Sequence, residues 1–114
     1  MINLLVFNSL RRGGSDHLVL LPEKFYGSFL LRGYSLFHSP SVGYYILPGN
    51  GFITVDMFSL PEEKYARLKR NFMSSCCHEI SVDLYETTAF LWTLCPGSNS
   101  PSDGRRLLTG DIFK

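Results

Sequence analysis

The sequence predicts a single α+β domain in which short strands form a closed or nearly closed sheet with helices beside it. Aromatic and branched residues recur in short runs, glycines separate these runs, and one stretch has the pattern of an amphipathic helix. A chain of 114 residues is long enough to bury a modest core without disulfides or metals. No stretch has the composition of a linker or a repeat, so we expect residues 1–114 to form one domain.

The predicted strands are short and rich in β-branched and aromatic residues. In residues 52–59, apolar and polar side chains alternate in part, which is typical of a strand with one packed face. The expected strand ranges are 2–7, 27–37, 43–47, 52–59, 78–85 and 88–94.

One helix is clearly marked after the fourth of these strands. Ser59 and Glu62 have the spacing of a capping box, and Pro61 suits a first helical turn. The helix is expected to continue to Phe72, with a basic last turn and a buried face made of Tyr65, Leu68 and Phe72. A second, shorter helix is expected over residues 15–22.

Composition limits the classes of partner. The net charge of +1 gives no field that would attract a nucleic acid polymer. The initial apolar run is too short to span a membrane and lacks the basic start of a signal peptide. Three basic pairs are expected on the surface, and they would favour an anionic small molecule if they converged: Arg11–Arg12, Lys69–Arg70 and Arg105–Arg106.

The cysteines argue for a reducing compartment, so the chain is expected to be cytoplasmic. Their number is odd, and Cys76 and Cys77 are adjacent, which does not suit a disulfide framework. Adjacent cysteines before His78 also lack the spacing of a zinc site, with Cys95 as the one distant partner. We therefore expect no metal and no cofactor. Residues 96–104 are expected to form a mobile surface loop.

The most informative stretch follows the first predicted strand, where a polar turn contains two arginines and two glycines. Such a turn is suited to hold an anion, because glycines let backbone N–H groups converge and arginines add charge. It matches neither a dinucleotide fingerprint nor a phosphate-binding P-loop. The candidate ligand-binding residues are Phe7, Asn8, Ser9, Leu10, Arg11 and Arg12, to which Phe72 is added below.

This turn resembles the Tyr-Gly-[Ser/Thr]-Leu-[Lys/Arg]-Arg-Gly signature of the γ-glutamyl cyclotransferase-like family. The family's later motifs also have counterparts, in the same order: Ser-Asp-His at residues 15–17, Gly-Ser-Phe-Leu-Leu-Arg-Gly-Tyr at 27–34, Pro-Gly-Asn-Gly at 48–51 and Thr-Gly-Asp-Ile at 109–112. The last resembles the Ser-Gly-Asp-Trp ending of the γ-glutamylamine cyclotransferase branch. The resemblance covers nearly the whole chain and implies a small mixed, largely antiparallel β-barrel with flanking helices.

The resemblance also implies a reaction whose general base is missing here. Cyclotransferases of this family release 5-oxoproline when the substrate's α-amine attacks its own γ-carbonyl, and a glutamate in the pattern Leu-Asp-x-x-Glu-Gly takes the amine's proton. In the matching stretch, Phe72 stands at the glutamate position and Lys69 at the aspartate position. Loss of a general base lowers a rate by about 10²–10⁴-fold. Phe7 and Asn8 likewise replace the tyrosine and glycine of the signature turn.

Three residues remain as candidates for a relocated base: Asp56, His78 and Glu79. Asp56 lies in a predicted strand on the face opposite Val55 and Met57, and His78 follows the helix. For each of them, a surface or hydrogen-bonded structural role is the more common outcome.

The sequence thus supports three hypotheses. The first is a catalytically degenerate cyclotransferase fold that binds or sequesters an anionic metabolite or nucleotide-type signal, for example in phage counter-defence. The second is an active γ-glutamylamine cyclotransferase with a relocated base. The third is a protein-interaction module whose pocket is filled by Phe72. The sequence leaves the oligomeric state open, a homo-oligomer included.

Overall fold

The computed structural model describes the whole chain except residues 22, 41–42, 73–76, 85–86, 95–103 and 114. Within this part, six strands and one α-helix follow the order β1, η1, β2, β3, α1, β4, β5, β6, in which η1 is a short 3₁₀ helix. Their bounds are β1 Ile2–Val6, η1 His17–Leu20, β2 Lys24–Ser39, β3 Gly43–Leu60, α1 Glu62–Phe72, β4 Cys77–Leu84, β5 Thr87–Leu94 and β6 Arg105–Leu107.

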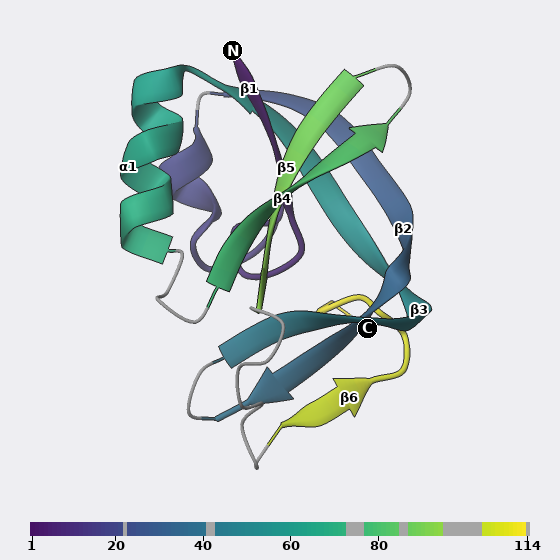
Figure 1. The fold of residues 1–114 in the computed structure, drawn as a ribbon. Helices are drawn as coiled ribbons and strands as arrows, with labels where there is room; N and C mark the ends of the chain where they lie inside the picture. The colour runs from purple at the N-terminus through teal and green to yellow at the C-terminus, as the bar shows by residue number, and fades with distance from the viewer. Residues whose placement is uncertain (22, 41–42, 73–76, 85–86, 95–103, 114) are drawn as a thin grey trace.

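The strands form one mixed sheet in the order β4-β5-β1-β3-β2-β6. The β1–β5 pair is parallel and the other pairs are antiparallel. Figure 1 shows this sheet curving into a half-barrel, with α1 packed on one side. The C-terminal half of β2 and the N-terminal half of β3 lie below the other strands in this view, next to β6. The predicted fold class, a small mixed and largely antiparallel barrel-like sheet, is confirmed, with a single α-helix in the described part.

The long β2–β3 ribbon bends because its pairing is irregular at two points. Between Phe25 and Gly27, β2 contains one extra residue, and between Arg32 and Tyr34 the partners in β3 jump from Phe52 to Pro48. Gly27 and Gly33 have φ angles of 125° and 95°, values that side chains rarely adopt. The two strands predicted at 43–47 and 52–59 are therefore halves of one bent strand, β3, which runs on through residues 49–51 although these have no partner in the register with β2.

The helix forms where the sequence predicts it, but its predicted cap is wrong. Ser59 belongs to β3 and is buried, so it does not begin the helix. The first turn is instead closed by the Tyr65 N–H, which donates to the Pro61 carbonyl at 2.9 Å. Tyr65 and Leu68 are buried as expected, whereas Phe72 is 37% exposed. The second predicted helix is reduced to η1, and β6 is a strand that the sequence did not predict.

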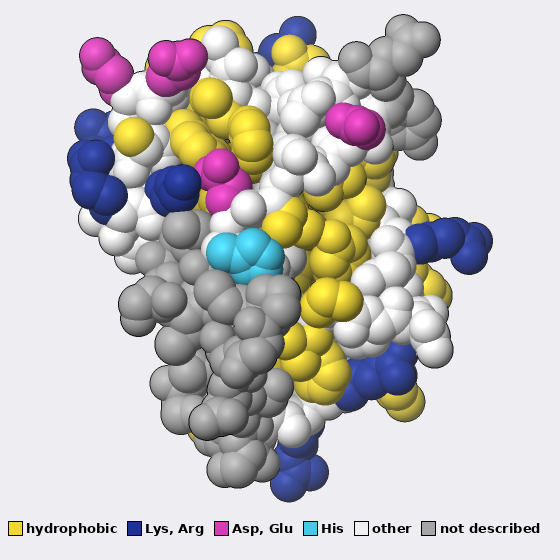
Figure 2. Space-filling view, viewed as in Figure 1, with side chains coloured by type: hydrophobic (Ala, Val, Ile, Leu, Met, Phe, Trp, Pro, Cys, Tyr) yellow, Lys and Arg dark blue, Asp and Glu magenta, His cyan; other side chains and the backbone are white. Residues whose placement is uncertain are grey.

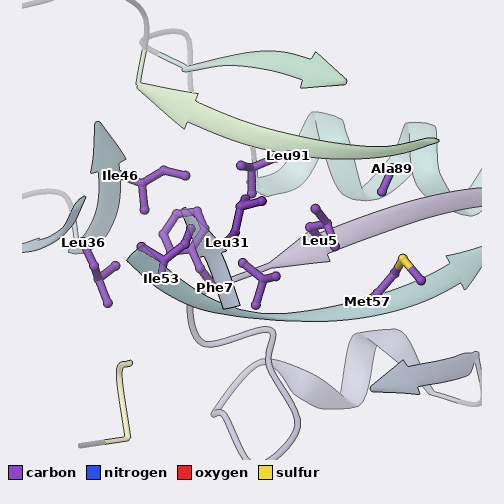
Figure 3. Packing of buried hydrophobic residues seen from close by; sticks show 10 residues of the cluster. Leu5, Phe7, Leu31, Leu36, Ile46, Ile53, Met57, Ala89 and Leu91 are labelled. Atoms are coloured by element: carbon purple, nitrogen blue, oxygen red, sulfur yellow. The ribbon is translucent and has the colours of Figure 1, made fainter. Parts of the chain in front are cut away.

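Two apolar cores lie on opposite faces of the sheet. One joins β1, β2, β3 and β5 on the inner face, where the labelled side chains in Figure 3 converge: Leu5, Phe7, Leu31, Leu36, Ile46, Ile53, Met57, Ala89 and Leu91. The other joins the sheet to α1 and η1 through Leu4, Val6, Leu10, Leu20, Phe58, Leu60, Tyr65, Leu68 and Trp92. Alternate residues of β1 thus serve different cores, as a strand with two covered faces requires.

Several sequence expectations concern other segments of the chain. Cys76, Cys95 and all of the predicted loop 96–104 except Gly104 lie outside the described residues. No helix in the described part is long and apolar enough to cross a membrane. In the same part, no group of three or more His, Cys, Asp or Glu side chains is arranged to hold a metal ion.

Candidate functional site

The arginine turn is anchored in both cores. It leaves β1 at Phe7, whose side chain lies in the inner core, and Leu10 inserts into the core beneath α1. Both side chains are almost fully buried, at 6% and 0% exposure. Burial of two large apolar side chains stabilises this conformation by about 1.5–3 kcal/mol each. The position of the turn relative to the sheet is therefore fixed.

The turn is closed by its own polar groups. The Arg11 N–H donates to the Asn8 carbonyl at 3.0 Å, and the Gly14 N–H donates to the Arg11 carbonyl at 2.7 Å. The Leu10 N–H donates to Asn8 Oδ1 at 3.1 Å. Asn8 thus occupies the Leu10 N–H, one of the backbone donors that were expected to bind a ligand.

Ser9 and Gly14 complete the turn. Ser9 Oγ donates to Asp16 Oδ2 at 2.5 Å, and the Asp16 N–H donates back to the Ser9 carbonyl. A Cβ atom on Gly14 would stand 2.1 Å from the Ser9 carbonyl oxygen, so only glycine fits at this position.

Arg11 faces inward and is neutralised there. Its side chain is 8% exposed; Nη1 lies 2.7 Å from Asp111 Oδ1, and Nε lies 3.3 Å from Asp56 Oδ1. The Nε contact is an ion pair without hydrogen-bond alignment, because Nε has no hydrogen-bond partner. The guanidinium also stacks on the Phe113 ring. This arginine therefore ties the C-terminal segment to the turn and is not available to a ligand.

Arg12, by contrast, is exposed. Its backbone N–H donates to Asp56 Oδ2 at 2.8 Å, which fixes the backbone at this position. Its guanidinium lies over the Phe25 ring, 4.8 Å from the centroid. A cation placed over an aromatic face is held in position while its outer side stays in water. Of the two arginines, Arg12 is the one positioned to meet an anion.

Asp56 is 1% exposed, and both of its oxygens are engaged. Oδ1 accepts the Ser28 hydroxyl proton at 2.6 Å and lies beside Arg11, while Oδ2 accepts the Arg12 N–H. A general base must come within hydrogen-bond reach of the proton that it removes. The burial of Asp56 favours a structural role in positioning both arginines.

Glu79 belongs to a separate cluster at the edge between α1, β4 and β5. It accepts the Tyr65 hydroxyl proton and lies 3.2 Å from Lys69 Nζ. Trp92 Nε1–H donates to the Tyr65 oxygen at 3.1 Å. Burial raises the pKa of Tyr65, and its hydrogen bond to Glu79 raises it further. Figure 2 shows acidic, basic and histidine side chains gathered on this face beside a hydrophobic band.

The candidate residues therefore fall into two groups. The turn residues 7–12 lie with Asp56, whereas Glu79 and His78 lie on β4, where His78 Nδ1 contacts Thr93 Oγ1 at 3.3 Å. Among the described residues, the hydrogen bonds and ion pairs of Asp56 and those of Glu79 share no residue. Phe72 ends α1, and residues 73–76 that follow it lie outside the described part.

Asp111 and Ser28 are site residues that the sequence analysis missed. The Thr-Gly-Asp motif at 109–111 was noticed only as a family-like ending. Asp111 in this motif could have been considered as an ion-pair partner for one of the arginines. The separation of 100 positions between Arg11 and Asp111 gave no local indication of the pair.

Comparisons with known proteins agree with this fold. No family model matches the chain. A Pyrococcus horikoshii protein named "Putative gamma-glutamylcyclotransferase PH0828" is 26% identical over 111 residues, which cover 97% of this chain and 90% of that protein. The crystal structure of PH0828 matches with a TM-score of 0.84 at 25% identity, over 98% of this chain and 90% of that chain.

Two further solved structures share the fold at lower identity. The solution structure of ytfP from Escherichia coli has a TM-score of 0.70 at 19% identity, over 97% of this chain and 96% of that one. Allophanate hydrolase of Kluyveromyces lactis has a TM-score of 0.80 at 15% identity, and the match covers 98% of this chain but only 20% of that one. In both sequence and fold, the chain is similar to this Pyrococcus protein along nearly its whole length.

Proposed function

We propose that this chain is a binding protein on a cyclotransferase-like fold, which holds a small metabolite through one anionic group and does not turn it over. The observation that carries this proposal is that the two adjacent arginines differ in burial and in their partners. Arg11 is buried against two carboxylates, and Arg12 is exposed on a backbone that Asp56 fixes.

The charges around the turn favour a single carboxylate over a polyphosphate. The turn and its surroundings hold two arginines, Arg11 and Arg12, against three carboxylates, Asp16, Asp56 and Asp111, so these side chains carry no net positive charge. A nucleotide-type ligand with several negative charges would meet no net positive field. One carboxylate can still pair with the exposed guanidinium of Arg12, in the two-point geometry typical of arginine. An amino-acid-derived metabolite fits this arrangement.

That the protein does not turn its ligand over is inferred from two residues at which a general base is expected, Phe72 and Asp56. Phe72, at the position that the family resemblance gives to the glutamate, cannot accept a proton. Asp56 has both oxygens engaged inside the protein. These two residues support a site that binds without deprotonating the substrate's amine.

A calorimetric titration with L-glutamate and a γ-glutamyl amine, followed by chromatography for 5-oxoproline, tests the proposal. The expected result is binding with intact ligand, and Arg12→Gln should weaken it about tenfold or more, the usual effect of losing a charge-assisted hydrogen bond. Arg67→Gln is the matched control, because Arg67 is exposed on α1. No binding by the native protein at millimolar ligand, or equal binding by Arg12→Gln, would overturn the proposal.

The second candidate function is an active γ-glutamylamine cyclotransferase that uses Glu79 as its base. The observation that favours it is the partial exposure of this carboxylate, 25%, together with its fixed position between Tyr65 and Lys69. Release of 5-oxoproline by the native protein and its loss in Glu79→Gln would support this candidate. The same activity in Glu79→Gln would exclude Glu79 as the base.

A further inference from the structure

The structure contains a cavity at the opposite end of β1 from the arginine turn. Its volume is about 280 Å³, and it is lined by Asn3, Tyr26, Phe29, Met57, Leu84 and Thr87, which come from β1 to β5. Asn3 lies four positions before Phe7, which is about 13 Å along an extended chain. The cavity therefore shares no residue with the turn that carries the proposed function.

The cavity has an apolar body and one polar edge. Met57 is 7% exposed and belongs to the inner core, while Phe29 and Leu84 pack against that core. Asn3 and Thr87 supply the polar edge, and none of the six lining residues is charged. A lining of this kind suits a neutral ligand, because no charged partner would offset the cost of burying an ion.

Tyr26 is brought to the cavity by the irregular pairing of β2. Phe25 pairs with Phe58 and Gly27 with Met57, so Tyr26 is the extra residue of a bulge. Before the bulge Phe25 packs on the α1 side of the sheet, and after it Phe29 packs on the inner side. Tyr26 is 47% exposed, and Lys24 Nζ lies 4.8 Å from the centroid of its ring. Bulges commonly redirect side chains beside binding sites.

The polar edge offers one acceptor. Asn3 Nδ2 donates to Thr87 Oγ1 at 3.1 Å and to the Thr88 carbonyl at 3.3 Å, so both of its hydrogens are used. This arrangement orients the amide, and Asn3 Oδ1 has no hydrogen-bond partner among the described residues. A ligand with an N–H or O–H group could donate to this oxygen.

We propose that this cavity binds a small neutral aromatic molecule with one hydrogen-bond donor, of the size of indole or phenol. Apolar cavities of roughly 150 Å³ already hold benzene, so the present volume admits a larger ring. The rings of Tyr26 and Phe29 and the Met57 thioether provide the aromatic and sulfur contacts that such a ligand prefers. A hydrogen bond from the ligand's donor group to Asn3 Oδ1 then fixes the orientation of the ligand in the cavity.

Indole is the probe, and amide chemical shifts of the ¹⁵N-labelled protein are the measurement. Titration to millimolar indole should shift the Asn3 side-chain amide and the backbone amides of Met57 and Thr87. N-Methylindole, which lacks the donor, should bind about tenfold more weakly. Shifts that scatter over the surface, shifts that gather at residues 7–14, or equal binding of the two probes would overturn the proposal.

Two variants test the location of the site. Leu84→Trp should fill the cavity and abolish indole binding, whereas Leu18→Trp, at a position 76% exposed, should leave it unchanged. Arg12→Gln should also leave it unchanged, so failure of this proposal and failure of the proposed function are distinguishable. If Leu84→Trp does not fold, the shifts in the native protein decide the question alone.

Discussion

Arg11 and Asp111, 100 positions apart in the sequence, are joined by a 2.7 Å contact between Nη1 and Oδ1 inside the protein. Asp111 Oδ1 also accepts the Phe113 N–H, and the Thr54 N–H donates to the Gly110 carbonyl. The C-terminal segment is thereby fastened to both β3 and the arginine turn.

Asp111→Asn should destabilise the protein by about 3 kcal/mol, because it leaves part of the buried Arg11 charge without its partner. Because Asp56 still pairs with Arg11, the expected loss of stability lies at the lower end of the range for breaking a buried ion pair. Thermal unfolding should show a decrease in Tm of roughly 10 °C. Asp83→Asn is the control, because Asp83 is exposed and its hydrogen bond to Thr88 lies at the surface. Equal Tm values for the two variants would contradict the structural role of Arg11.

Gly14→Ala should disrupt the turn. The added Cβ would stand 2.1 Å from a backbone oxygen that cannot move without breaking the Ser9–Asp16 contacts. We expect a loss of about 2–3 kcal/mol in urea unfolding. Gly33→Ala is the matched control: its φ of +95° strains alanine by about 1–2 kcal/mol, but its Cβ meets nothing within 4 Å. A larger effect at Gly33 than at Gly14 would show that the turn is not closed as described.

Tyr65→Phe should destabilise the protein by about 1–2 kcal/mol, because the Trp92 N–H would lose its acceptor inside the core. Trp92 is the single tryptophan, so the change in environment should appear directly in its fluorescence. Unaltered emission in the folded variant would contradict the hydrogen bond. Phe25→Leu is a suitable comparison, since Phe25 packs against the same core without touching this hydrogen bond.

The raised pKa of Tyr65 has a consequence for alkaline stability. The folded protein holds the phenol proton more tightly than the unfolded chain, whose tyrosine pKa is 10.0. The stabilising contribution is therefore complete below pH 10 and is lost as the pH rises from 10 toward the folded pKa. Native Tyr65 should thus add to the decline in unfolding free energy above pH 10, and Tyr65→Phe should decline less steeply. Parallel curves would contradict the assigned shift.

Asn8→Gly tests whether the turn binds ligands through its backbone. The substitution removes Oδ1 from the Leu10 N–H and introduces glycine, the residue found here in the signature that the turn resembles. If the proposed carboxylate ligand can reach this donor, its affinity in calorimetry should rise about tenfold, the value of one added charge-assisted hydrogen bond. Asn50→Gly, at an exposed position of β3, should have no such effect. If Asn8→Gly and Asn50→Gly both bind the ligand as the native protein does, the backbone of the turn does not contact the ligand and Arg12 alone binds its anionic group.

The sequence by itself determined the fold class, most of the strands and the helix, because these depend on local patterns of apolar, glycine and charged residues. It also located the turn that carries Arg11 and Arg12. The cap at Ser59 was wrong and the join between the two halves of β3 was missed. Ser59 pairs with β2, and Pro48 and Phe52 pair with β2 on either side of the turn-like residues 49–51, so tertiary pairing overrides the local signals for a cap and a turn.

Only the tertiary structure decided what the two arginines do. Adjacent in sequence and identical in type, they differ because Asp56 and Asp111 converge on one of them from distant parts of the chain. The bulge that brings Tyr26 to the cavity is likewise a property of two paired strands. Charge neutralisation and strand register depend on contacts between remote residues, which no local pattern records.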